Sequence, residues 1–233
     1  MKINCVWEHN GDDSLVYIVD YPGAFTRGVS REAAVEKIPA EINAYFRWQG
    51  RPVLQSVDVI ISQEKESDLA ICDADSDVLF NEEHPTLTRD EYEELKALTL
   101  MSATDFQRLF HAIPNKEQSV LAERRTFYGY VPRTAQEMYD HTKSVNAYYF
   151  GEINVPADND GTIVECRQRG FSILEQMPNF LNNDVINGSY GEQWTLRKVL
   201  RRFVWHDRIH AKAMYRMALQ TFGENAIPNI FGF

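Results

Sequence analysis

Residues 195–214, TLRKVLRRFVWHDRIHAKAM, decide the fold that we expect for most of the chain. Apolar residues recur here at helical spacing, Thr195 is a suitable N-cap and Gly223 a suitable stop, so the sequence predicts one long helix. His206 and His210 are four positions apart and therefore project from one face of that helix. A helical wheel places four apolar side chains on the same side: Val199, Phe203, Ala213 and Met217. Because this face is apolar, we expect both histidines to point into the protein interior.

Three more amphipathic helices are expected before this one. Two of them open with a capping box, formed by Thr88 with Glu91 and by Thr134 with Glu137. A third, less regular pattern covers residues 161–181. Four amphipathic helices of this length indicate an all-α four-helix bundle.

A third histidine is expected to face the interior of the same bundle. On the helix that follows Thr134, the helical wheel places His141 beside Met138 and Val145. Three inward-facing imidazoles on two helices form the open, three-nitrogen ligand set of a catalytic zinc or nickel site. The alternative is that all three are core histidines, hydrogen-bonded to their neighbours. We interpret the trio as metal ligands: His141, His206 and His210.

Two further residues are candidates for catalytic roles next to such a site. Arg202 precedes His206 by one turn, where its guanidinium could hold a substrate carboxylate in a bidentate manner. The alternative is an ordinary surface arginine in the basic run that starts at Arg197. Tyr148, or its neighbour Tyr149, could donate a hydrogen bond to a developing oxyanion. The alternative for both tyrosines is helix packing.

The first 70 residues are expected to form a separate α+β domain. Strands rich in Val, Ile, Tyr and Trp flank a turn signal at residues 10–13, and a short strand follows a second turn. Ser30 is a plausible N-cap for a helix that reaches Gly50 and is kinked at Pro39. The expected order is β-β-β-α-β, with strands over residues 2–8, 14–21, 24–28 and 57–61.

An acidic segment is expected to join the two domains. Asp73, Asp75 and Asp77 have the spacing that opens a calcium loop, but Val78 and His84 occupy positions where an EF-hand needs Gly and Glu. We therefore interpret the segment as a solvated linker. The predicted division is residues 1–70 for the α+β domain, 71–87 for the linker and 88–233 for the bundle.

Composition excludes several classes of protein. The chain has 233 residues and a net charge of -10, so it lacks the basic surface that nucleic-acid binding needs. No apolar run approaches the roughly 18 residues of a membrane span, and residues 1–10 have no signal-peptide pattern. The cysteines Cys5, Cys72 and Cys166 lack the spacing of a disulfide framework or a thiolate zinc site. We expect a cytoplasmic protein with reduced thiols and no membrane partner.

The first domain resembles a known family in one stretch. Residues 21–46, YPGAFTRGVSREAAVEKIPAEINAYF, are similar to HicB-like antitoxins, which carry a Pro-Gly-x-x-Thr-x-Gly hairpin followed by an acidic, Ala-rich helix. The resemblance implies a small α+β fold and a toxin-like protein as a partner. The alternative is an accessory domain that packs on or positions its neighbour.

The helical part resembles the DinB/YfiT-like superfamily. Residues 133–153, RTAQEMYDHTKSVNAYYFGEI, and 192–214, EQWTLRKVLRRFVWHDRIHAKAM, are similar to its second and fourth helices. The resemblance implies that His141, His206 and His210 hold a divalent metal, often nickel or zinc. Members of the superfamily include bacillithiol S-transferases and mycothiol-dependent isomerases.

These observations lead to three functional hypotheses. The first is metal-dependent transfer of a low-molecular-weight thiol, such as bacillithiol or mycothiol, to a small electrophilic substrate. The second is metal-dependent hydrolysis by a metal-activated water. The third is a non-catalytic, metal-sensing or partner-binding protein that acts through its HicB-like domain. A homodimer is one open option for the assembly.

Overall fold

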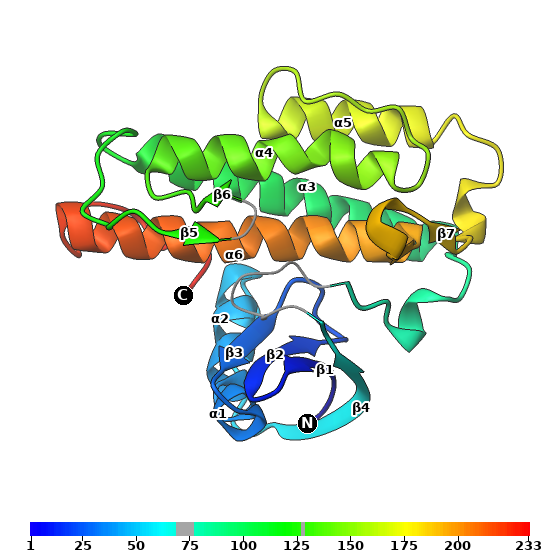
Figure 1. Cartoon of the computed structure of the whole chain (residues 1–233), viewed down its shortest axis with the longest axis horizontal. Helices are drawn as coiled ribbons and strands as arrows, with labels where there is room; N and C mark the ends of the chain where they lie inside the picture. Colours follow the sequence, from blue (N-terminus) through cyan, green and yellow to red (C-terminus); the bar gives the residue numbers. More distant parts are fainter. Residues whose placement is uncertain (69–76, 127–128) are drawn as a thin grey trace. The chain divides into compact units, whose positions relative to one another are not determined.

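The computed structural model describes residues 1–68, 77–126 and 129–233. These residues form a mixed α+β protein in which a four-stranded sheet is followed by several helices (Figure 1). The chain divides into two compact units. Unit 1 comprises Met1–Glu83 with Phe231–Phe233, and unit 2 comprises His84–Ile230. The aspartates at 73 and 75 of the calcium-loop pattern, and the cysteine at 72, lie outside the described residues.

Unit 1 is built on a sheet with strand order β3-β2-β1-β4. The hairpin predicted around residues 10–13 is present, because β1 (Lys2–Asn10) pairs antiparallel with β2 (Asp13–Ile18). Strand β3 (Phe25–Gly28) extends the sheet on one side, and β4 (Asp58–Glu66) pairs parallel with β1 on the other. The β-β-β-α-β order of strands and helical segment is therefore as expected.

The expected kinked helix of unit 1 is instead two helices, α1 (Arg31–Val35) and α2 (Ile38–Trp48). Ser30 caps α1 as predicted, since its side chain accepts a hydrogen bond from the backbone N–H of Ala33. Pro39 explains the break. A proline has no N–H to donate and is tolerated only in the first turn of a helix, so a new helix starts there.

Residues 77–83 are not the solvated linker that the sequence predicts. Val78, Phe80 and Glu83 are buried within unit 1, and Asn81–Glu83 form a short 3-10 helix. The side chain of Gln63 on β4 holds this segment, donating to the carbonyl oxygen of Leu79 and accepting from the N–H of Asn81. The apolar side chains of Val78 and Phe80 lie among the acidic residues. The free energy gained by their burial outweighs the preference of the neighbouring charged groups for solvent.

Residues 231–233 also depart from the predicted division, because they belong to unit 1. The ring of Phe231 stacks on that of Trp48, with 5.2 Å between ring centroids. The guanidinium of Arg47 donates two hydrogen bonds, of 2.8 and 3.1 Å, to the carbonyl oxygen of Gly232. Unit 1 is thus assembled from two segments that are far apart in the sequence.

The described residues of unit 2 contain four α-helices: α3 (Arg89–Ala112), α4 (Ala135–Gly151), α5 (Ile163–Leu174) and α6 (Leu196–Phe222). The capping boxes predicted at Thr88 and Thr134 are both present. Helices α3 and α4 each pack against both α5 and α6 (Figure 1). Tyr149, Phe150 and Phe203 are central to the buried core that these helices share.

Helix α5 ends at Leu174, earlier than the predicted residue 181. The ring of a proline clashes with the carbonyl four residues before it, which here is that of Leu174, so Pro178 prevents continuation of the helix. Two small antiparallel pairs were not predicted, because strands of two residues show no periodicity. They are β5 (Arg125–Thr126) with β6 (Gly129–Tyr130), and β7 (Ile186–Asn187) with β8 (Gln193–Trp194).

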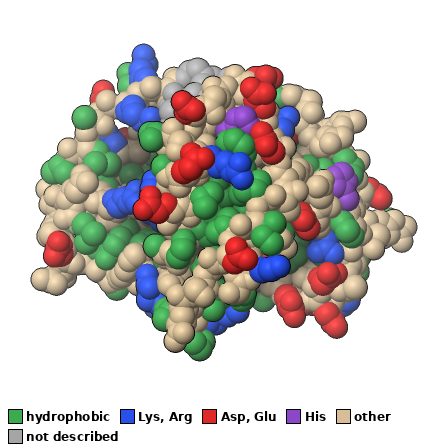
Figure 2. Space-filling view, turned by 90° about the horizontal axis from the view of Figure 1, so that it is seen from below, with side chains coloured by type: hydrophobic (Ala, Val, Ile, Leu, Met, Phe, Trp, Pro, Cys, Tyr) green, Lys and Arg blue, Asp and Glu red, His purple; other side chains and the backbone are tan. Residues whose placement is uncertain are grey.

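The described helices include none that is long and apolar enough to span a membrane. Acidic and basic side chains are intermixed on the face shown in Figure 2.

Two of the cysteines are buried thiols, and we expect them to resist alkylation in the folded protein. Burial, with a smaller contribution from Asp20, raises the pKa of Cys5 to about 12, and burial also raises the pKa of Cys166. At pH 8 a thiol with the pKa of Cys5 is about one part in ten thousand thiolate, which is the reactive form. Iodoacetamide should therefore modify Cys5 and Cys166 only after guanidinium is added, as measured by peptide mass spectrometry. Rapid modification of native Cys5 would contradict its buried position.

Candidate metal centre

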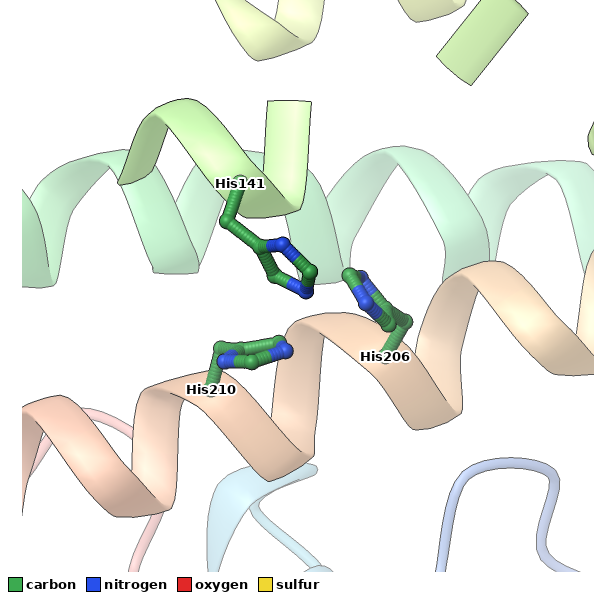
Figure 3. Close-up of side chains that lie close together, drawn as sticks. All are labelled: His141, His206 and His210. Carbon is green, nitrogen blue, oxygen red and sulfur yellow. The ribbon is translucent and has the colours of Figure 1, made fainter. Parts of the chain in front are cut away.

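The three predicted histidines converge between two helices of unit 2. His141 projects from α4, and His206 and His210 project from α6 toward it (Figure 3). Their centroids are 5.1 Å apart for His141 and His206, 4.6 Å for His141 and His210, and 4.5 Å for His206 and His210. One ring nitrogen from each lies within 4.8 Å of the others.

The three histidines differ in their exposure to solvent. His206 is buried, whereas His141 and His210 are partly exposed. The cluster therefore has a buried side toward the core and a side that is partly exposed to solvent. A catalytic metal site needs such an open position, in contrast to a closed structural site.

The electrostatic surroundings keep His206 neutral. Burial lowers its pKa well below 6.5, and the charges of His210 and His141 lower the pKa further. Among the described residues, Nδ1 of His206 is buried without a hydrogen-bond partner. A buried, unpaired ring nitrogen costs about 1–3 kcal/mol, and the neutral imidazole is the form that binds metals.

The donor set fits a divalent transition metal. Three imidazole nitrogens suit zinc, nickel and copper, whereas magnesium and calcium prefer oxygen ligands. Bond lengths of about 2.0–2.1 Å to the ion would require nitrogens about 3.4 Å apart in a tetrahedral arrangement. The other described histidines, His9, His84 and His111, are not part of the group.

Arg202 is buried rather than a surface residue. Its side chain is 1% exposed, and Nη2 donates a hydrogen bond of 3.3 Å to the hydroxyl oxygen of Tyr149. The guanidinium also lies over the rings of Trp194 and Trp205. Arg202 and Arg167 both lower the pKa of His206 through their charges. The positive charge of Arg202 therefore disfavours protonation of His206.

Tyr149, and not Tyr148, lies next to the cluster. The ring of Tyr149 meets that of His206 edge to face, with 5.9 Å between centroids. Tyr148 contacts Trp194 and lines a separate pocket near the end of α4. The sequence predicts either tyrosine for this role, and Tyr148 is two turns from His141 along the same helix. Packing of α4 against α6 instead turns the neighbouring position toward His206.

A buried ion pair that the sequence does not predict lies beside the cluster. The guanidinium of Arg167 on α5 contacts both carboxylate oxygens of Asp207 at 2.6 and 3.2 Å, and neither side chain is exposed. Asp207 follows His206 directly and so ties the chain at that point to α5. The sequence contains one indication of this ion pair. Asp207 is next to an inward-facing histidine, and a charged residue is rarely buried without a partner.

Comparisons with protein-family models, with curated proteins and with solved structures gave no significant match to this chain. The functional assignment therefore depends on the geometry of the site and on the sequence resemblances.

Proposed function

We propose that unit 2 is a metal-dependent transferase that joins a low-molecular-weight thiol to an electrophilic small molecule. The observation that carries the proposal is the convergence of His141, His206 and His210. A nickel or zinc ion on these ligands would acidify a bound thiol, so that the thiolate forms near neutral pH. The resemblance of α4 and α6 to DinB/YfiT-like proteins supports the same assignment, with bacillithiol or mycothiol as candidate thiols.

The residues around the histidines would favour such a reaction in two ways. The buried guanidinium of Arg202 favours an anionic thiolate over a neutral thiol beside His206. The partly exposed His141 and His210 leave one side accessible to the second substrate. In the transfer, the thiolate sulfur bonds to the electrophilic carbon, the leaving group departs with its electron pair, and the thiol proton passes to solvent.

For unit 1 we propose a HicB-like fold that serves as an accessory domain. Its sheet with two helices and the sequence of residues 21–46 support this proposal.

Turnover of an electrophile tests the transferase proposal. The nickel- or zinc-loaded protein would be incubated with a chlorinated aromatic electrophile, with and without bacillithiol, mycothiol or cysteine, and chloride release measured. We expect chloride release only when a thiol is present, and its loss in His210→Ala. Equal turnover without thiol would instead support hydrolysis. Absence of turnover with every thiol in metal-loaded protein would favour a non-catalytic role.

A further inference from the structure

A second pocket of unit 2 lies at the end of α4, on the face of that helix that also carries His141. Its volume is about 350 Å³, and it is formed by the last turns of α4 and the loop that contains β7. Polar groups that line it include Tyr148, Glu152, Asn154, Asn187 and Ser189. His141 and Glu152 are separated by three turns, so the pocket lies about 16 Å along α4 from the histidines.

The distinctive group in this pocket is the carboxylate of Glu152. The residue is only 6% exposed, and its Oε2 accepts a hydrogen bond of 2.7 Å from the backbone N–H of Ser189. Among the described residues, no cation forms an ion pair with it and no second donor contacts the carboxylate. The buried amine of Lys198, on α6, is instead held by Glu192 Oε1 at 2.8 Å and by the carbonyl oxygen of Gln193 at 2.7 Å.

The loop that contains β7 brings the backbone of Gly188 close to the Glu152 carboxylate. A Cβ added at Gly188 would lie 1.8 Å from Glu152 Oε2 and 2.7 Å from Cδ1 of Trp194, so no other residue fits there without displacing them. A buried carboxylate without a countercharge is costly, and proteins rarely keep one unless it is paired. One oxygen of the Glu152 carboxylate accepts a hydrogen bond from the protein, and a pocket lies beside the group. These are the properties of a binding site for a cationic ligand.

We propose that the Glu152 pocket binds the primary ammonium group of a small molecule. Oε2 is already occupied by the Ser189 N–H, which disfavours the bidentate contact that a guanidinium makes and suits a compact ammonium donor. Asn154 and Asn187 also line the pocket, and the partly exposed ring of Tyr148 provides an aromatic surface for a cation. A divalent metal is disfavoured because the pocket contains a single carboxylate. The proposal is independent of the metal site and of the transferase function.

The test is a titration of the full chain with n-butylammonium, followed by the backbone amide signal of Ser189 in two-dimensional NMR. A chelator is present throughout, because free amines also bind metal ions. We expect a saturable shift of the Ser189 signal with n-butylammonium and none with 1-butanol, which has the same chain length but no charge. In Glu152→Gln the dissociation constant should rise at least about tenfold.

Matched controls separate binding from folding. Glu94→Gln removes the same charge from an exposed position of α3 and should leave amine binding unchanged. Glutamine at 152 can still accept from the Ser189 N–H, so Glu152→Gln should melt at or above the temperature of the wild type. The proposal is overturned if n-butylammonium does not bind, if it binds Glu152→Gln equally well, if 1-butanol produces the same shifts, or if Glu152→Gln melts at a lower temperature.

Discussion

His141→Ala and His210→Ala are each expected to lose the metal that the wild type binds. After incubation with nickel or zinc and gel filtration, the wild-type protein should retain about one equivalent per chain. Loss of a residue that only orients a ligand already costs about 10–100-fold in metal affinity, so loss of a ligand should cost at least about a hundredfold. Mass spectrometry of metal content measures the result directly.

His141 and His210 are better positions for these variants than the buried His206. His141 and His210 are partly exposed, so their replacement by alanine removes less buried side chain than replacement of His206 would. His84→Ala, at an exposed position outside the cluster, is the matched control and should retain the metal. Metal at one hundred times its dissociation constant should also stabilise the wild type by about 2.7 kcal/mol. A wild type that stays metal-free, or variants that bind as tightly as it does, would show that the three histidines are core residues.

The second large effect is expected from Asp207→Ala, which breaks the buried ion pair with Arg167. Removal of one partner leaves the other charge buried and uncompensated, and this costs about 3–5 kcal/mol in the free energy of unfolding. Urea unfolding followed by circular dichroism measures the change. The exposed pair of Arg89 and Glu93, with side chains 55% and 52% exposed, provides the control. Glu93→Ala should change the free energy of unfolding by less than about 1 kcal/mol.

A double variant distinguishes the uncompensated charge from a simple loss of volume. In Arg167→Leu with Asp207→Leu, both charges are absent and apolar side chains fill much of the space, so most of the lost stability should return. An Asp207→Ala protein within about 1 kcal/mol of the wild type would instead mean that solvent reaches Arg167, contrary to its complete burial.

Local signals in the sequence predicted much of the fold. Capping boxes at Thr88 and Thr134 and the N-cap at Thr195 start helices α3, α4 and α6 where expected, because each supplies hydrogen bonds to N–H groups that the first turn leaves unpaired. The features that were missed depend on contacts distant in sequence. Burial of Phe80 and the return of residues 231–233 to unit 1 are examples.

Some features of the candidate site could be predicted from the sequence, and others could not. The spacing of His206 and His210 is a property of one helix and could be derived from the sequence, and His141 followed from the apolar face of another helix. The choice between Tyr148 and Tyr149 required the rotation of α4 against α6, which no local pattern encodes. The pairing of Arg167 with Asp207 required knowledge of which helix lies beside which. Glu152 was not predicted because its burial depends on the loop at Gly188.

The two-segment construction of unit 1 affects how the protein is made. Phe231 and Gly232 contact Trp48 and Arg47, yet the ribosome must translate all of unit 2 between these segments. At about 5–20 residues per second, translation of residues 84–230 takes roughly 7 to 30 s. During that interval the ring of Trp48 lacks its contact with Phe231. Unit 1 can therefore be completed only after unit 2 has been synthesised, although its sheet emerges from the ribosome before unit 2 does.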